Sequence, residues 1–219
     1  MNIKAAIFDM DGTLVDSLFL WEVIWSTFGD KYLNDKTFTP STDDDKKVRT
    51  LTLKDAMDLI HKNYNLGENG EELLQFANSI MLDFYSNTVK LKSGVREFLE
   101  YLKSQNTKMC IASATAPELL FVALKQCDIE KYFSKVFSCG EIGKGKDEPD
   151  VFLLAKDYLK TSIEDIWVFE DSLIAIETAA KIGMKTVGVY DKFNFGHDKM
   201  KELAIEFIDK DETLLKLIS

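Results

Sequence analysis

Acidic residues occur in two places that each follow an apolar run. Asp9 and Asp11 are separated by one residue near the N-terminus, and Glu170 is adjacent to Asp171 late in the chain. If these carboxylates meet, two like charges about 4 Å apart repel by about 4 kcal/mol at an effective dielectric of about 20. A divalent cation relieves this repulsion, and oxygen donors without a nearby His or Cys suit a hard ion such as Mg²⁺. The predicted metal-binding residues are Asp9, Asp11, Glu170 and Asp171.

Groups that attract an anion stand near the other apolar runs. Ser113 offers a hydroxyl, Lys146 offers a positive charge, and the backbone N–H groups of Gly12 and Ala114 add hydrogen-bond donors. Combined with a cation, these groups describe a pocket for a phosphoryl group. They are therefore predicted to bind the substrate.

Two of the carboxylates are candidates for the chemical steps. Asp9 is the candidate nucleophile, because it ends a rigid buried run and is firmly positioned there. Asp11 lies two residues later in the turn and is oriented differently, so it can give a proton to the leaving oxygen.

The residues above can meet only if the chain brings the ends of several strands to one edge. Continuous apolar runs too short for helices indicate strands that are buried on both faces of a parallel sheet. Such runs cover 5–8, 109–112, 166–169 and 186–189, and a weaker one covers 136–139. Because open parallel sheets bind ligands at the carboxyl ends of their strands, the polar residues that follow these runs are expected at one site.

Amphipathic stretches with helix start signals separate these runs. Thr115, followed by Pro117 and Glu118, has the pattern of a capping box that opens a helix. Helices are expected over 94–103, from 117 to about 124, from 149 to about 159, and over 173–182. Strand and helix alternate from Lys92 onward, which predicts an α/β fold with a doubly wound parallel sheet, a Rossmann-like core.

The region 16–87 breaks this alternation. Helices are expected over 18–28, after a cap at Thr52, and over 71–85, with a polar loop through 41–45 and no convincing strand. We therefore predict a helical cap domain at 16–87, inserted after the first strand. The α/β catalytic core is predicted to combine residues 1–15 with residues 88–219.

The composition limits the partners and the compartment. The 219 residues include 27 Lys and Arg against 37 Asp and Glu, and the resulting net charge of −10 repels nucleic acids and anionic lipids. Three cysteines without CxxC spacing indicate buried thiols in a reducing compartment. With no signal peptide or membrane span apparent, the sequence predicts a cytoplasmic protein without a nucleic-acid or membrane partner. It leaves the oligomeric state open, and a monomer is compatible with it.

The ordered motifs resemble those of the haloacid dehalogenase superfamily, in its Mg²⁺-dependent aspartyl-phosphate branch. They are Asp9-Met10-Asp11-Gly12-Thr13, Ser113, Lys146 and Glu170-Asp171. The insertion at 16–87 is similar to the small helical cap of the β-phosphoglucomutase-like subfamily.

This resemblance implies a role for each motif residue. Asp9 would attack phosphorus, and Asp11 would act as general acid and then activate water. Ser113 and Lys146 would hold the phosphoryl oxygens. The metal would be bound by Asp9, the Asp11 carbonyl and Asp171, with Glu170 close to it or among its ligands.

The leading hypothesis is a phosphatase for a small phosphorylated metabolite, and a sugar-phosphate mutase is the alternative. Trp21 stands where mutase-like relatives often have a histidine, which weakens the mutase interpretation. A mutase also needs a second anion site, and the candidate is Arg49, the one arginine of the 16–87 region, together with Lys46 or Lys47.

Two further classes share some of these features. Residues 140–147 nearly form a phosphate-binding Walker A loop, but Asp147 stands where Ser or Thr should meet Mg²⁺. A non-catalytic phospho-acceptor of the response-regulator kind also combines acidic residues, a hydroxyl and a lysine. Such a protein lacks a helical insertion after its first strand, and its acceptor aspartate ends a later strand.

Overall fold

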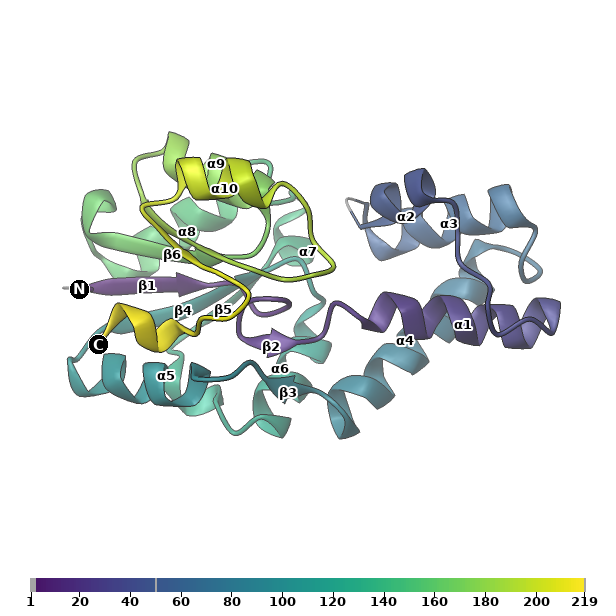
Figure 1. The fold of residues 1–219 in the computed structure, drawn as a ribbon, viewed down its shortest axis with the longest axis horizontal. Helices are drawn as coiled ribbons and strands as arrows, with labels where there is room; N and C mark the ends of the chain where they lie inside the picture. The colour runs from purple at the N-terminus through teal and green to yellow at the C-terminus, as the bar shows by residue number, and fades with distance from the viewer. Residues whose placement is uncertain (1–2, 50, 219) are drawn as a thin grey trace. The chain divides into compact units, whose positions relative to one another are not determined.

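The computed structural model describes residues 3–49 and 51–218, and the chain divides into two compact units (Figure 1). Met1–Leu18 and Val89–Ser219 form an α/β unit, and Phe19–Thr88 form a helical unit. The α/β unit is therefore discontinuous in the sequence, because the helical unit is inserted into it.

Six parallel strands form one sheet within the described part of the α/β unit. In spatial order they are β5 (Val136–Ser138), β4 (Lys108–Ser113), β1 (Ala5–Phe8), β6 (Ile166–Glu170), β7 (Lys185–Val189) and β8 (Glu206–Ile208). The predicted doubly wound α/β sheet is confirmed, and the apolar runs lie in its strands. β8 was not expected, and Cys139, the last residue of the weaker run, begins a helix instead.

Helices cover both faces of this sheet. They are α5 (Val95–Ser104), α6 (Pro117–Gln126), α7 (Cys139–Ile142), α8 (Asp150–Leu159), α9 (Leu173–Lys181) and α10 (His197–Leu203). On one face, the apolar side of α8 packs against β1 and β4, while α9 packs against β6 and β7. On the other face, Phe98 of α5 makes edge contacts with Phe8 and Phe169, whose rings stack at a centroid distance of 4.4 Å.

The start of α6 differs from the sequence prediction. This helix begins at Pro117 with Ala116 as its N-cap residue, and Thr115 lies before it. The prediction that Thr115 caps this helix is therefore wrong, and its hydroxyl bonds elsewhere, as described below.

A short antiparallel pairing joins the two places where the α/β unit is interrupted. β2 (Val15–Asp16) pairs with β3 (Lys90–Leu91), so that Val15 lies opposite Leu91 and Asp16 opposite Lys90. Two residues on each side are too few to leave a sequence pattern, which explains why this pairing was not predicted. Its effect is to hold the segment after Asp9 beside the segment that returns to the core.

The helical unit consists of amphipathic helices around an aromatic core. They are α1 (Leu20–Leu33), α2 (Thr42–Val48), α3 (Leu53–Tyr64) and α4 (Gly70–Asn87). Trp25 and Phe28 of α1 are buried, and the ring of Phe28 stacks on that of Phe76 at 5.6 Å. These side chains therefore form the core of the unit itself. As predicted, Thr52 caps α3, its hydroxyl accepting from the Asp55 N–H at 3.1 Å.

The polar stretch 41–45 forms the N-cap and the first turn of α2 rather than a loop. The hydroxyl of Ser41 accepts a hydrogen bond from the Asp44 N–H at 3.2 Å and so caps α2. Asp44 accepts from the Tyr64 hydroxyl and Asp45 accepts from the Trp25 indole, at 2.7 and 2.8 Å. The loop prediction failed because Asp44 and Asp45, although half-exposed, have hydrogen-bond partners from other helices of the unit.

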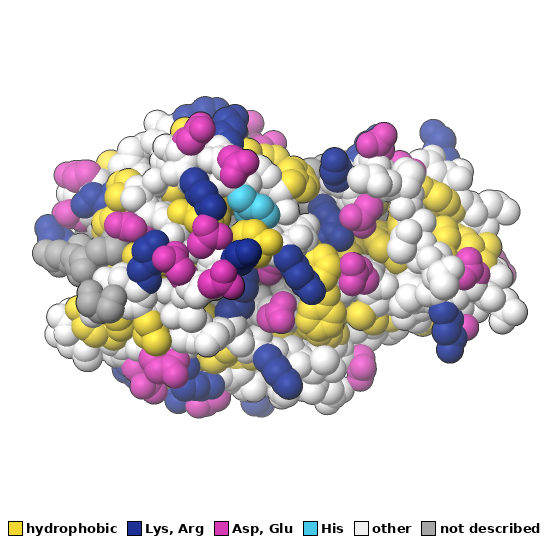
Figure 2. Space-filling model, viewed as in Figure 1, with side chains coloured by type: hydrophobic (Ala, Val, Ile, Leu, Met, Phe, Trp, Pro, Cys, Tyr) yellow, Lys and Arg dark blue, Asp and Glu magenta, His cyan; other side chains and the backbone are white. Residues whose placement is uncertain are grey.

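The surface of the α/β unit carries charges of both signs. Figure 2 shows acidic and basic side chains interspersed on the face in view. Within residues 3–49 and 51–218, no helix has both the length and the apolar character that a membrane crossing requires.

Candidate active site

Asp9 directly follows β1 and lies at the carboxyl edge of the sheet. Its backbone N–H donates to the carbonyl of Phe169 at 3.0 Å, which ties it to β6. Since Phe8 lies opposite Phe169 in the parallel register, the residue after each strand reaches the same edge. The strand register therefore brings Asp9 beside Glu170 and Asp171.

Asp9, Glu170 and Asp171 form a buried acidic cluster. Each offers a carboxylate oxygen, and these oxygens all lie within 4.8 Å of one another. Burial raises the pKa of Asp9 well above its usual range, and the neighbouring carboxylates of Glu170, Asp171 and Asp11 add to this, against the opposing charge of Lys146. Burial, followed by the charge of Glu170, raises the pKa of Asp171 to about 7.

The cluster fits a divalent cation. Its donors are all oxygen, as Mg²⁺ prefers, and burial together with the neighbouring carboxylates raises the pKa of Asp9 and of Asp171, so a cation bound among them would stabilise their anionic forms. Asp9 and Asp171 can serve as ligands, with Glu170 as a further carboxylate at the same place.

Lys146 supplies a positive charge inside this cluster. Its ammonium contacts Oδ1 of Asp9 and Oε1 of Glu170, and its side chain is 11% exposed. Burial on its own lowers the pKa of Lys146, but the two carboxylates outweigh this effect and raise it. The positive charge of Lys146 therefore lies beside Asp9, where a cation can attract a phosphoryl oxygen.

The side chain of Asp11 is held apart from the acidic cluster. Its Oδ1 accepts a hydrogen bond from the Ser17 hydroxyl at 2.6 Å, and its Oδ2 accepts one from the Thr115 hydroxyl at 2.7 Å. Two hydroxyl donors fix the plane of this carboxyl group. Asp11 is thus positioned differently from Asp9, as its expected role in proton transfer requires, and its carboxylate is outside the cluster.

The remaining predicted donors surround the same edge. Gly12 has a φ of +80°, and a Cβ added there would lie 2.3 Å from Oδ2 of Asp171, so its backbone closely approaches this carboxylate. Ser113 ends β4 in a buried position, where its Oγ accepts from the Thr115 N–H at 3.1 Å. Ala114 follows it and is exposed.

Three residues at this edge were not predicted as site residues: Asn194 and Lys92, which lie outside the motifs, and Thr13, the last residue of the turn after β1. Asn194 donates from Nδ2 to Oδ2 of Asp171 at 2.8 Å, and Thr13 donates to Oδ1 of the same residue at 3.2 Å. Lys92 lies nearby, paired with Asp191. Thr13 belongs to the recognised turn, but the loop that carries Asn194 has no apolar or motif pattern that indicates its position.

Arg49 belongs to the helical unit and is already paired there. Its guanidinium bonds the Asp45 carboxylate at 3.0 and 3.3 Å and lies 5.9 Å from the ring centre of Trp21. An anionic group that binds Arg49 must therefore either share the guanidinium with Asp45 or displace Asp45 from it.

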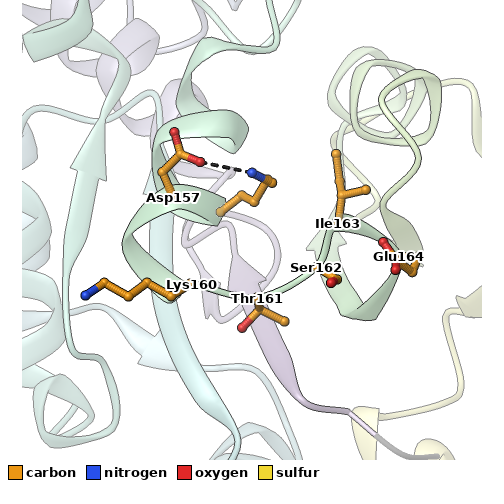
Figure 3. Close-up of a pocket in the computed structure, with 7 residues that line it drawn as sticks. Asp157, Lys160, Thr161, Ser162, Ile163 and Glu164 are labelled. Carbon is orange, nitrogen blue, oxygen red and sulfur yellow. Dashed lines mark hydrogen bonds and ion pairs between the residues drawn. The ribbon is translucent and has the colours of Figure 1, made fainter.

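A surface hollow of about 490 Å³ lies at the opposite edge of the sheet (Figure 3). It is lined by the end of α8 and by the turn that leads into β6, at the amino end of the strand whose carboxyl end carries Glu170. Lys156 and Asp157 in its wall pair with each other at 3.0 Å. This hollow is therefore remote from the acidic cluster and does not mark the active site.

The fold and the strand-end acidic cluster are those of a haloacid dehalogenase-like hydrolase. The family model for the haloacid dehalogenase-like hydrolase matches residues 6–189, so the chain belongs to this family and is identified as an enzyme of it. The family predicted from the motifs is confirmed.

Individual relatives cover nearly the whole chain. A phosphorylated carbohydrates phosphatase of Thermotoga maritima is 26% identical over 214 residues, which is 97% of both chains. A beta-phosphoglucomutase of Bacillus subtilis is 27% identical over 198 residues, covering 85% of this chain and 83% of the relative. The crystal structure of a putative beta-phosphoglucomutase from Thermotoga maritima superposes with a TM-score of 0.80 at 25% identity and covers 99% of both chains.

Proposed function

We propose that the protein is a Mg²⁺-dependent phosphatase that hydrolyses a small phosphorylated metabolite, such as a sugar phosphate, through a phospho-aspartate on Asp9. The observation that carries this proposal is the placement of Asp9, buried at the end of β1, in contact with Lys146 and beside Glu170 and Asp171. The similarity to a phosphatase named for phosphorylated carbohydrates supports the substrate class.

Asp9, Asp171 and the Asp11 carbonyl would hold the ion, with Glu170 close to it or among the ligands. When bound, Mg²⁺ offsets the negative charge of the cluster and of the phosphoryl group that approaches it. Lys146, Ser113 and the N–H groups of Gly12 and Ala114 would bind the phosphoryl oxygens. Together, the proposed metal-binding and phosphoryl-binding residues come from the ends of β1, β4 and β6 and from the loop before α8.

The reaction proceeds in two steps on the residues of this chain. First, an oxygen of Asp9 bonds to phosphorus while the bond between phosphorus and the leaving-group oxygen breaks. Asp11 gives its proton to the leaving-group oxygen, which departs as an alcohol. Second, Asp11 takes a proton from water, the water oxygen bonds to phosphorus, and the Asp9 carboxylate is released. The hydroxyls of Ser17 and Thr115 keep Asp11 oriented for both transfers.

The helical unit is proposed to be the cap domain that selects the substrate and limits access of water to the first step. Its sequence bounds are proposed as 16–87, close to the compact unit Phe19–Thr88. Arg49 is the proposed contact for a second anionic group, if the substrate carries one.

A mutase is the second candidate, because one relative is named beta-phosphoglucomutase and a similar solved structure is described as a putative beta-phosphoglucomutase. A mutase must hold a bisphosphate in two orientations and therefore needs a strong second anion site. The pairing of Arg49 with Asp45 favours the phosphatase, since this guanidinium is partly neutralised within its own unit.

A panel of phosphorylated sugars, nucleotides and short acids tests the proposal, with Mg²⁺ or with a chelator. We expect phosphate release from one or more sugar phosphates that requires Mg²⁺. Conversion of glucose 1-phosphate to glucose 6-phosphate without net phosphate release would establish the mutase instead. A stable phosphoprotein without turnover would contradict both.

A further inference from the structure

Lys92 joins three segments of the α/β unit that are far apart in the sequence. Its ammonium donates to the carbonyl oxygens of Gly12 at 2.5 Å and Tyr190 at 2.9 Å, and to Oδ2 of Asp191 at 2.9 Å. The side chain of Asp191 is 4% exposed and that of Lys92 is 21% exposed. Since an ammonium has three donors, these acceptors use all of them, and Lys92 is committed to the protein rather than to a substrate.

Two of the segments that Lys92 joins also contact the carboxylate of Asp171. The backbone of Gly12 approaches Oδ2 of Asp171 so closely that a Cβ at this position would lie 2.3 Å from the oxygen. Asn194, in the loop after Tyr190, donates to the same oxygen at 2.8 Å and to the Asp171 carbonyl at 3.1 Å. The position of this carboxylate therefore depends on where both segments are held.

Asp191 links the ammonium of Lys92 to Asn194. While its Oδ2 binds Lys92, its Oδ1 accepts from the Phe193 N–H at 3.0 Å, and its carbonyl accepts from the Asn194 N–H at 3.1 Å. Aspartate side chains that accept from a backbone N–H two residues later fix a turn. The ion pair thus fixes the turn that presents the Asn194 amide.

We propose that Lys92 is a positioning residue for Asp171, because its ammonium holds both the Gly12 backbone and the Asp191–Asn194 turn against that carboxylate. The inference rests on the proposed function, in which Asp171 binds Mg²⁺. Lys92 acts only through these neighbours, and residues that orient metal ligands in this way alter metal affinity by about 10- to 100-fold when they are replaced.

The test is Mg²⁺ binding by the full chain, measured by titration calorimetry. Lys92→Met keeps the aliphatic stem and removes the three donors, and Lys90→Met is the matched control, since Lys90 is exposed two residues earlier in β3. We expect Lys92→Met to raise the Kd for Mg²⁺ about tenfold or more. We expect no change for Lys90→Met. At saturating Mg²⁺, kcat should return close to that of the unmodified protein, because Lys92 does not touch the reacting groups.

Coupling with Asn194 separates positioning from general stabilisation. If both side chains act on Asp171, the double variant Lys92→Met/Asn194→Ala raises the Kd by less than the product of the two single effects. Thermal unfolding verifies that each variant is folded. If Lys92→Met does not fold, Lys92→Gln replaces it, because Gln retains hydrogen-bond donors at this position.

A folded Lys92 variant with an unchanged Kd would overturn the inference, and so would independent effects of Lys92 and Asn194. In both cases, Mg²⁺ binding and phosphate release by the unmodified protein would leave the proposed function intact. If the unmodified protein neither binds Mg²⁺ nor releases phosphate, the proposed function fails, and the inference fails with it.

Discussion

The hydroxyl of Thr115 donates a 2.7 Å hydrogen bond to Oδ2 of Asp11, although 104 residues separate them in the chain. Together with the Ser17 hydroxyl on Oδ1, this bond fixes a carboxyl group that the proposed mechanism uses twice. The contact links the end of β4 to the turn after β1, so the position of Asp11, the proposed general acid, depends on both segments.

Replacing Thr115 by valine tests this relationship at nearly constant volume. Hydrogen bonds to charged groups contribute about 1.5 to 3 kcal/mol, so we expect Thr115→Val to lower kcat by about tenfold or more. KM should change less, because Asp11 acts on the leaving group. Thr161→Val is the control, since Thr161 bonds the Leu159 carbonyl at the opposite edge of the sheet. Equal kcat values for the two variants would contradict the role of Thr115.

Removal of the Lys146 charge should affect both substrate binding and chemistry. Lys146→Met leaves the carboxylates of Asp9 and Glu170 without the cation that contacts them. We expect kcat/KM for phosphate release to fall by about 100-fold or more. Lys144→Met is the matched control, because Lys144 is exposed and pairs with Asp150 at 2.9 Å. Steady-state kinetics of both variants would refute the assignment if Lys146→Met lost no more activity than Lys144→Met.

Gly12→Ala should disturb the metal site directly. The added Cβ would lie 2.3 Å from Oδ2 of Asp171, and the φ of +80° is unfavourable for alanine. We expect the Kd for Mg²⁺ to rise about tenfold or more, with a loss of about 1–2 kcal/mol in the free energy of unfolding. In Gly140→Ala the new Cβ meets only Ser138 Oγ at 3.5 Å, so this control should bind Mg²⁺ normally. Normal binding by Gly12→Ala would show that the turn does not constrain Asp171.

Mg²⁺ binding should weaken as the pH falls below neutrality. Burial and the charge of Glu170 raise the pKa of Asp171 from 3.8 to about 7, so protons compete with the cation below about pH 7. Calorimetry between about pH 5.5 and 8.5 should show a Kd that increases towards low pH, with protons released on binding. A Kd independent of pH over this range would contradict the prediction.

The raised pKa of Asp171 also predicts that the metal-free protein becomes less stable as the pH rises, whereas Mg²⁺ binding becomes stronger. Because the pKa of Asp171 is higher in the folded chain, the folded state holds more protons than the unfolded state between about pH 4 and 7. The contribution of this residue to the free energy of unfolding therefore decreases as the pH rises through that window. Denaturant titrations measure the free energy of unfolding at each pH, and in Asp171→Asn this decrease with rising pH should be smaller than in the unmodified protein. The same pH dependence in both proteins would contradict the prediction.

The core of the fold was predictable because burial leaves a strong sequence pattern. β1, β4, β6 and β7 each contain a short, largely apolar run without alternation, which is how strands covered on both faces appear. β8 is a three-residue edge strand that includes Glu206, so it lacks this pattern. The run Asp43–Asp45 resembled a solvated loop because its partners, such as Tyr64 and Trp25, lie elsewhere in the chain.

The site was predictable to the extent that its residues end strands. Asp9, Ser113 and the Glu170–Asp171 pair could be placed at one edge by the topology of a parallel sheet. Thr115 was misassigned as a cap, because local spacing reveals nothing of its bond to Asp11. Asn194 bonds the carboxylate of Asp171, and Lys92 bonds the carbonyl of Gly12. Neither residue lies in a local sequence pattern, so only the folded structure identifies these contacts.

The most direct test of the central claim is transfer of labelled phosphate to Asp9. The protein is mixed with Mg²⁺ and a hydrolysable sugar phosphate that carries labelled phosphorus. The reaction is quenched in acid, and the labelled peptide is identified by mass spectrometry. We predict label on the peptide containing Asp9, and loss of both label and phosphate release in Asp9→Asn, with Asp157→Asn, an exposed residue of α8, as the active control. Full Mg²⁺-dependent phosphate release by Asp9→Asn would contradict the account.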